Sequence, residues 1–250
     1  MSLFSFPEVD AGDYRFAAPF PHIYIDNAWH QPTLDACARD VAGFQQWDGE
    51  KQFFGARQKR HCGNIAVMPA SVVDIISAAS TPRFIAWLEA MTGERELHCD
   101  PYLEGGGIHS IGTGGFLKIH ADFNWHAQLQ LYRRLNLLIY LNDGWQAAWD
   151  GCIELFADPK QDPEVSLLPV MNRMLIFTTD DASFHGHRRP LACPEDVRRN
   201  SIALYYYSPI QPDSNFAKAR TDSIYRTRAF ERFDVPLRQR LGRLVKAVTG

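Results

Sequence analysis

The sequence lacks the features that mark secreted, disulfide-rich or membrane-spanning proteins. Its five cysteines are scattered, odd in number and without Cys-x-x-Cys spacing, which argues against a disulfide framework and against a structural zinc site. No basic and then apolar segment opens the chain, and no run of about 18 apolar residues could span a bilayer. We therefore expect a cytoplasmic protein with reduced cysteines.

An excess of charge of one sign is also lacking. Lys and Arg total 26 and Asp and Glu total 29, so the net charge is -3 and predicts neither a nucleic-acid binder nor a membrane-surface binder. No internal repeat divides the 250 residues, 46% of which are hydrophobic, enough to bury a full core. We expect a single domain over residues 1–250. The sequence indicates no oligomeric state.

Helices are predicted in the first half of the chain. After an alternating strand at 20–26, apolar residues at i, i+3, i+4 and i+7 predict a helix from Thr33 to Gly43, and a second helix is predicted over 71–79. A third begins with Thr81 as N-cap and ends at Gly93. We expect this N-terminal strand and its helices, residues 20–95, to support one face of a sheet, and residues 1–19 to be irregular.

Residues 45–69 are polar and contain a basic cluster, Arg57, Lys59, Arg60 and His61. The cluster could meet an acidic substrate, but a solvated, irregular loop is the simpler interpretation.

From Leu97 onward the sequence changes to glycine-broken strands. The glycine-rich segment 105–115 lacks the Lys-Ser/Thr ending of a P-loop, so we interpret it as tight turns between strands. Apolar strands are predicted at 134–142, 150–156, 174–178 and 201–207, and a C-terminal helix at 235–249. About eight short strands after helices predict a mainly β fold with flanking helices (α+β), built on a sandwich or barrel.

The segment 114–122 ends in a His-x-Asp pair. Alternate strand residues share a face, so His120 and Asp122 can present a nitrogen and a carboxylate oxygen to one point, which suits a divalent metal. One more histidine, His185 or His187, would complete the two-histidine, one-carboxylate facial triad that leaves positions of Fe(II) open. The two later histidines share strand parity, so the pattern leaves both open.

Polar residues also occur in the apolar strand 134–142. Asn136 and Tyr140 share one of its faces. Buried polar groups need partners, so we expect these side chains to point into a barrel interior where a ligand could satisfy them. A hydrogen bond to another protein group is the alternative.

Taken in order, these motifs resemble the 2-oxoglutarate and Fe(II)-dependent dioxygenases of the prolyl-hydroxylase-like branch. The resemblance covers residues 105–207, and the strand at 20–26 is similar to the family's opening. It rests on Gly-Gly-Phe-Leu-Lys-Ile-His-Ala-Asp-Phe (114–123), Arg-Leu-Asn-Leu-Leu-Ile-Tyr-Leu-Asn (134–142), Trp-Asp-Gly-Cys-Ile-Glu-Leu (149–155), Phe-His-Gly-His (184–187) and Arg-Asn-Ser-Ile-Ala-Leu-Tyr-Tyr (199–206). It implies a double-stranded β-helix core, of the jelly-roll or cupin-like kind, over residues 97–207.

The resemblance implies that His120, Asp122 and one distal histidine bind iron and are the catalytic center. The family's usual form, a histidine followed two residues later by an apolar residue, puts that ligand at His185. His187 then occupies the apolar position, where it could supply a hydrogen bond to the ligands.

The resemblance also implies a cosubstrate site. Arg199 resembles the family arginine that pairs with the distal carboxylate of 2-oxoglutarate, with Ser201 as its hydroxyl helper and Tyr140 as a further hydrogen-bonding group. Asp150-Gly151 stands where the family commonly has two glycines, a departure that removes no ligand.

The implied cofactors and cosubstrates are Fe(II), 2-oxoglutarate and O2, and the family also admits ascorbate. The implied reaction hydroxylates an unactivated C-H bond and releases succinate and CO2. Asp122 favours hydroxylation, because related halogenases replace this carboxylate with a small residue. The substrate would be a prolyl residue or peptide, or a small amino-acid-like molecule, with Phe123, Trp125 and Trp145 as candidates for its pocket.

Two other interpretations compete with an oxygenase. A non-catalytic metal-binding or sensory β-barrel could hold a metal in the same triad, but it would need no carboxylate clamp such as Arg199. A zinc hydrolase could also use two histidines and an aspartate, but the His-Glu-x-x-His arrangement that such hydrolases often use is missing.

Overall fold

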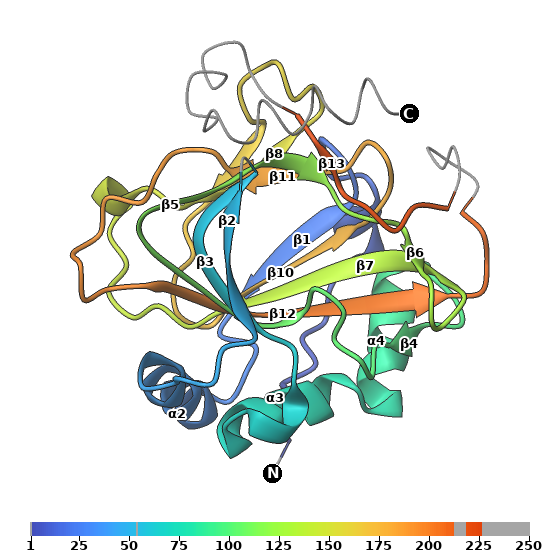
Figure 1. The fold of residues 1–250 in the computed structure, drawn as a ribbon. Coiled ribbons are helices and arrows are strands. Elements are labelled where there is room, and N and C mark those ends of the chain that lie inside the picture. Colours follow the sequence, from blue (N-terminus) through green and yellow to red (C-terminus); the bar gives the residue numbers. More distant parts are fainter. Residues whose placement is uncertain (1, 54, 213–218, 227–250) are drawn as a thin grey trace.

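The computed structural model describes residues 2–53, 55–212 and 219–226. Its strands form one antiparallel sheet that curls on itself (Figure 1). The main path runs through β1 (His22–Asp26), β10 (Arg173–Thr178), β7 (Leu131–Tyr140), β12 (Arg199–Ser208), β5 (Gly107–Ala121), β11 (Phe184–His187), β8 (Ile153–Phe156) and β9 (Val165–Leu167).

The remaining strands pair with this path at its sides. They are β2 (Gly49–Phe53) on β3 (Ala56–Cys62), β3 and β13 (Ile224–Tyr225) on β5, β4 (His98–Cys99) on β12, and β6 (Trp125–His126) on β7. Within the described residues, β5 therefore has four strand partners, β12, β11, β3 and β13. Most of the site residues described below lie on β5 or on a strand that pairs with it.

Helices cover the side of the sheet that contains β12 and β7 (Figure 1). They are α1 (Ala11–Arg15), α2 (Gln31–Ala42), α3 (Ala70–Ala79) and α4 (Pro82–Thr92), with short 3-10 turns at Ile65–Val67 and Ala147–Trp149. α4 has the predicted ends: Thr81 Oγ1 accepts a hydrogen bond from Phe84 N, and Gly93 follows with φ +82°. None of the described helices is both long and apolar enough to cross a membrane.

The alternation of β7 separates two environments. Leu135, Leu137 and Ile139 pack with the helices in the main core, while Asn136 and Leu138 line an interior cavity. Tyr140 is buried in a second apolar cluster, with Phe20, Ile153, Leu155, Leu175 and Phe177. The expected fold class, mainly β with flanking helices, is confirmed.

Three sequence-based expectations were wrong. From Gly107 onward the glycine-rich segment lies within β5, which continues to Ala121, and not in turns between strands; neighbouring strands on both sides satisfy its backbone groups. Residues 45–69 are not simply irregular, since they contain β2 and β3. The first 19 residues include the helix α1. The C-terminal helix expected at 235–249 lies outside the described residues.

Candidate metal and cosubstrate site

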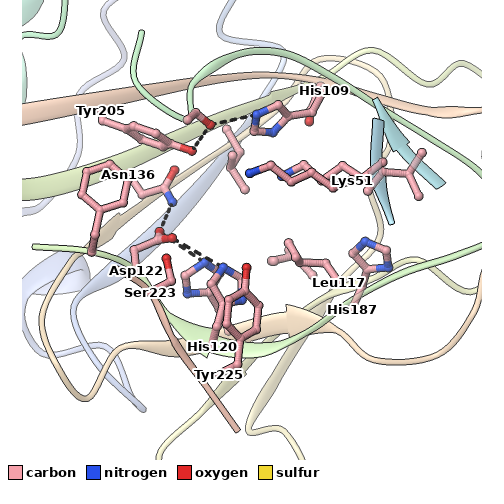
Figure 2. A pocket seen from close by; sticks show the side chains of 18 of the residues that line it. Lys51, His109, Leu117, His120, Asp122, Asn136, His187, Tyr205, Ser223 and Tyr225 are labelled. Atoms are coloured by element: carbon pink, nitrogen blue, oxygen red, sulfur yellow. Dashed lines mark hydrogen bonds and ion pairs between the residues drawn. The ribbon is translucent and has the colours of Figure 1, made fainter. Parts of the chain in front are cut away.

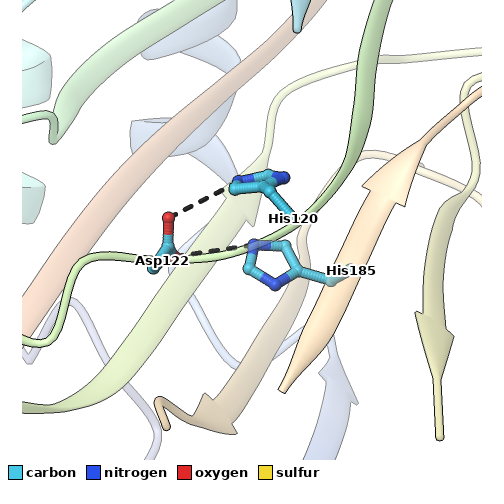
Figure 3. Close-up of side chains that lie close together, drawn as sticks. All are labelled: His120, Asp122 and His185. Atoms are coloured by element: carbon cyan, nitrogen blue, oxygen red, sulfur yellow. Dashed lines mark ion pairs between the residues drawn. The ribbon is translucent and has the colours of Figure 1, made fainter. Parts of the chain in front are cut away.

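Three side chains with metal-binding atoms meet where β5 and β11 pair. His120 of β5 lies directly opposite His185 of β11, and Asp122 follows just after β5 (Figure 3). His120 Nε2 is 3.4 Å from Asp122 Oδ1, and His185 Nε2 is 3.5 Å from Asp122 Oδ2. One ligand atom from each residue lies within 4.8 Å of the others. His187 lies opposite Leu117 and is not in this group.

Gly186 allows the two strands to approach. A Cβ atom at this position would lie 2.8 Å from the carbonyl oxygen of Leu117 and 3.0 Å from that of Lys118. Any other residue would therefore push β11 away from β5 and separate the opposed histidines.

Hydrogen bonds fix the orientation of both imidazole rings. Nδ1 of His120 lies 2.9 Å from the carbonyl oxygen of Lys118, and Nδ1 of His185 lies 2.9 Å from that of Ser183. A carbonyl oxygen only accepts, so each Nδ1 carries a proton and each Nε2 is directed at the carboxylate. Burial lowers the pKa of His185 to about 3, which keeps its ring neutral and able to bind a metal.

Two donors hold the carboxylate of Asp122. Its Oδ2 accepts hydrogen bonds from Arg133 Nη2 at 2.8 Å and from Asn136 Nδ2 at 3.1 Å. Burial alone would raise the pKa of Asp122, but the Arg133 guanidinium and the imidazoles of His120 and His185 together outweigh burial, and the pKa lies well below its usual range. Oδ1 has no such donors, so an ionised oxygen is available beside two imidazole nitrogens. This donor set fits Fe(II) and similar divalent metals.

Arg133 itself is fully buried between aromatic rings. Its guanidinium carbon lies 3.4 Å from the ring center of Tyr205 and 4.7 Å from that of Phe123. The cation is thus stabilised by two ring faces as well as by the carboxylate.

The three potential ligands form part of the wall of a cavity of about 330 Å³ (Figure 2). The other lining residues come from β2, β3, β5 and the residues that flank it, β7, β8, β11, β12 and the segment 221–225. They are Lys51, Lys59, Gly105, His109, Ile111, Leu117, Phe123, Arg133, Asn136, Leu138, Ile153, His187, Arg199, Ser201, Tyr205, Thr221, Asp222, Ser223 and Tyr225.

The expected cosubstrate residues lie together on β12 and β7. Arg199 Nε donates to the carbonyl oxygen of Gly151 at 2.7 Å, and its Nη2 donates to Tyr140 Oη at 3.3 Å. Ser201 lies opposite Tyr140 in the sheet. Arg199 and Ser201 line the cavity, whereas Tyr140 is fully buried and contacts Arg199.

Arg199 is 5% exposed, and no carboxylate among the described residues lies within 4 Å of its guanidinium. His187, at the same cavity, is 2% exposed and has both ring nitrogens without a partner. A buried guanidinium normally has an anionic partner. The distal carboxylate of 2-oxoglutarate would supply one, so these residues fit the cosubstrate.

The departure at Asp150-Gly151 has a local consequence. Asp150 has φ +56° and ψ -150°, a conformation that favours glycine. The second position of the turn is still a glycine, and the carbonyl oxygen of Gly151 accepts the hydrogen bond from Arg199. The aspartate therefore strains the turn without removing the contact to Arg199.

The three candidate pocket aromatics have different positions. Phe123 lines the cavity. Trp125 packs edge-on against Tyr132, and Trp145 packs against Trp149 in a separate cluster.

Lysines of the β2–β3 pair reach the cavity, which the interpretation as a solvated loop missed. Lys59 is 8% exposed, and burial, reinforced by the charge of Lys51, lowers its pKa to about 7. Its position in the basic cluster gave a signal, but the cluster could not show which side chain would point inward.

A C-terminal segment also reaches the site and had no recognisable signal in the sequence. β13 pairs with the end of β5, and the Tyr225 ring stacks on His120 with centers 5.2 Å apart and an angle of 17°. Arg220 anchors the segment by hydrogen bonds to Asp181 Oδ1 at 2.6 Å and to the backbone carbonyl of Asp122 at 3.0 Å. Residues 221–225 therefore cover one side of the cavity.

Comparisons with known proteins agree with this geometry. The sequence profile of the 2OG-Fe(II) oxygenase superfamily matches residues 106–207, the part of the chain that carries His120, Asp122, His185 and Arg199. No curated protein sequence matches the chain.

Several solved structures share the fold at low sequence identity. A Pseudomonas putida prolyl-4-hydroxylase has 15% identity and a TM-score of 0.57, over 79% of this chain and 98% of that one. A Trichoplax adhaerens prolyl hydroxylase, in complex with a hypoxia inducible factor peptide, has 17% identity and a TM-score of 0.54, over 75% and 83%. HygX from Streptomyces hygroscopicus, with nickel, 2-oxoglutarate and hygromycin B bound, has 12% identity and a TM-score of 0.53, over 80% and 92%.

The curled sheet is the double-stranded β-helix that the resemblance implied, and the fold matches that of prolyl-4-hydroxylases. The superfamily match adds the chemistry that the fold alone does not establish. Residues 106–207, which carry the site, therefore match the 2OG-Fe(II) oxygenase superfamily, and this match together with the buried His-Asp-His cluster indicates a dioxygenase that uses Fe(II), 2-oxoglutarate and O2.

Proposed function

We propose that His120, Asp122 and His185 bind Fe(II), and that the enzyme hydroxylates an unactivated C-H bond of a prolyl, peptide or small amino-acid-like substrate. One observation carries this proposal: a buried two-histidine, one-carboxylate cluster shares a cavity with a buried arginine, Arg199, that has no carboxylate partner among the described residues. The bound iron would supply the oxidative chemistry that converts 2-oxoglutarate to succinate and CO2 while one oxygen atom enters the substrate.

Arg199, Ser201 and Tyr140 would bind the distal carboxylate of 2-oxoglutarate. The Arg199 guanidinium is fixed by Gly151 and by Tyr140 before any cosubstrate arrives. A preorganised, always charged guanidinium loses little freedom on binding a carboxylate, which favours affinity. Ser201 adds a hydroxyl group on the cavity side of the same strand.

Other residues would position the ligands and exclude water. Arg133 and Asn136 hold Oδ2 of Asp122, which orients the carboxylate so that Oδ1 lies beside His120 and Oδ2 beside His185. Tyr225 covers one face of His120, and Phe177 packs against the ring of His185 with centers 4.6 Å apart. These contacts keep the ligand side chains in one rotamer, a condition for a defined coordination geometry.

Structural relatives support the substrate range. They include prolyl hydroxylases, one of them bound to a peptide, and an enzyme bound to hygromycin B, which is a small molecule. We also propose that residues 1–250 form one dioxygenase domain, since strands from β1 to β13 belong to a single sheet.

Anaerobic titration with Fe(II) and 2-oxoglutarate tests the residue assignments through the weak visible charge-transfer band of the chelate. We expect the band in the wild type, its loss in His185→Ala, and its retention in His187→Ala. His98→Ala, at an exposed histidine of β4, is the matched control and should leave the band unchanged. Arg199→Ala should weaken the affinity for 2-oxoglutarate by about tenfold or more, the value of a charged hydrogen bond.

A band that survives in His185→Ala and disappears in His187→Ala would show that the distal ligand is His187. Succinate release would then be measured with prolyl peptides, free proline and other amino acids. Stimulation by none of these would exclude the proposed substrate range while leaving the iron and cosubstrate assignments intact.

A further inference from the structure

A row of three cationic side chains and one isoleucine crosses four neighbouring strands of the cavity wall. Lys51 of β2 lies directly opposite Lys59 of β3, and Lys59 lies opposite Ile111 of β5, which lies opposite Arg199 of β12. All four residues line the cavity. Figure 2 shows the Lys51 side chain extending into the cavity, between His109 on one side and Leu117 and His187 on the other.

Two lysines in direct cross-strand opposition repel each other and lower the stability of a sheet. Lys59 is almost completely buried, which adds the cost of removing its charge from water. No carboxylate among the described residues lies within 4 Å of either ammonium nitrogen. The fold therefore keeps an unfavourable pair that an anion placed between the two side chains would stabilise.

The cavity also has an excess of positive charge that a further anion would neutralise. Four cationic side chains of the described residues line it, Lys51, Lys59, Arg133 and Arg199, against two carboxylates, Asp122 and Asp222. A ferrous ion would add two positive charges, and 2-oxoglutarate would bring two negative ones. With both bound and both lysines protonated, the cavity still has two positive charges in excess, and the two lysines are the cations without an assigned partner.

We propose that Lys51 and Lys59 bind an anionic group, a carboxylate or a phosphate, of the primary substrate and so select acidic substrates. This rests on the proposed function, because it assigns 2-oxoglutarate to Arg199. The cosubstrate clamp already has its own contacts on β12 and β7, whereas the lysines come from the β2–β3 pair on the other side of Ile111. The substrate would lie between the lysines and the triad, which line the same cavity.

The test uses matched compounds that differ only in the anionic group. Succinate release by the Fe(II)-loaded enzyme is measured with glutamate and glutamine, aspartate and asparagine, phosphoserine and serine, and an acidic peptide with its amide counterpart. Binding of each compound to the Mn(II) and 2-oxoglutarate-loaded protein is measured by calorimetry. The variants are Lys51→Met and Lys59→Met, with Lys160→Met as the control at an exposed lysine outside the cavity.

We expect one anionic compound to bind and to stimulate succinate release while its neutral counterpart does neither. Each cavity variant should raise the KM for that compound by about tenfold or more, with the KM for 2-oxoglutarate changed by less than about threefold. Lys160→Met should change neither value. The compound that responds distinguishes carboxylate from phosphate and free acid from peptide.

Several results would overturn the proposal. They are equal stimulation by charged and neutral counterparts, binding of no anionic compound to the loaded protein, or a rise in the KM for 2-oxoglutarate alone, which would assign the lysines to the cosubstrate. Failure of the proposed function is visible separately, because it would remove 2-oxoglutarate binding from the wild type before any compound is added.

Discussion

Replacing Arg133 with Met tests the electrostatics of the site most directly. The guanidinium is fully buried, lies 2.8 Å from Oδ2 of Asp122 and stacks on Tyr205. Met keeps much of the length of the side chain but removes the charge, so a buried carboxylate loses its main counter-charge. Breaking a buried ion pair on one side typically costs about 3–5 kcal/mol. We expect the free energy of unfolding to fall by about this amount in the metal-free protein.

Urea denaturation in the presence of a chelator measures this loss, and two further variants interpret it. Arg133→Met combined with Asp122→Asn removes both charges, so the double variant should lose less than the sum of the single losses by about 1–3 kcal/mol. Arg173→Met is the control for a more exposed ion pair, with side chains 17% and 40% exposed, and should cost about 1 kcal/mol or less.

Divalent metal gives a second readout of the same pair. A metal bound to Asp122 replaces part of the lost positive charge, so metal should stabilise Arg133→Met more than it stabilises the wild type. The reasoning would be refuted if Arg133→Met cost no more than Arg173→Met, or if the two single losses were simply additive.

Three further predictions concern stability and metal affinity. Burial and the charge of Lys51 lower the pKa of Lys59 to about 7, so between pH 7 and 10 the unfolded chain binds a proton that the folded chain has released. The free energy of unfolding should therefore rise with pH in this range, by up to about 1.4 kcal/mol per pH unit. Lys59→Met should remove this pH dependence in urea titrations of the metal-free protein. Asp150→Gly should raise the free energy of unfolding by about 1 kcal/mol, because it relieves a positive φ; a loss in denaturation experiments would contradict this. Gly186→Ala should weaken the affinity for divalent metal, measured by calorimetry, about tenfold or more. Gly43→Ala should leave this affinity unchanged, because a Cβ atom at position 43 would have no neighbouring atom closer than 3.9 Å.

The parts of the fold that depend on local pattern could be predicted from the sequence. The N-cap of α4 and its closing glycine, and the alternation of β7, are determined by residues close together in the chain. The pairing of His120 with Asp122 is also local, because a single residue separates them at the end of a strand. Choosing His185 over His187 needed the family resemblance, because the two share strand parity and only the cross-strand register distinguishes them.

The remaining site residues depend on contacts between distant segments. Arg133 immediately precedes the apolar strand predicted at 134–142, and nothing near it in the sequence indicates that its partner is Asp122, just after β5. Lys59 reads as solvated because its neighbours are polar, and its burial follows only from the pairing of β3 with β5. Tyr225 lies in a polar segment, and its role depends on β13 joining the same strand. Long-range strand pairing of this kind is not encoded by periodicity.

A change in the register of β5 explains how this strand directs both the proposed iron ligand His120 and the residues beside the cationic row into one cavity. Strict alternation would place Ile111 and Leu117 on the opposite face from His120, yet all three line the cavity. His185 lies opposite His120 and His187 lies opposite Leu117, so β5 has one more residue than β11 between these two pairs, the geometry of a β-bulge. The bulge reverses the parity of β5 between Leu117 and His120. The row that contains Lys59 and the pair His120–His185, the proposed iron ligands, can therefore face the same interior, which a regular strand could not achieve.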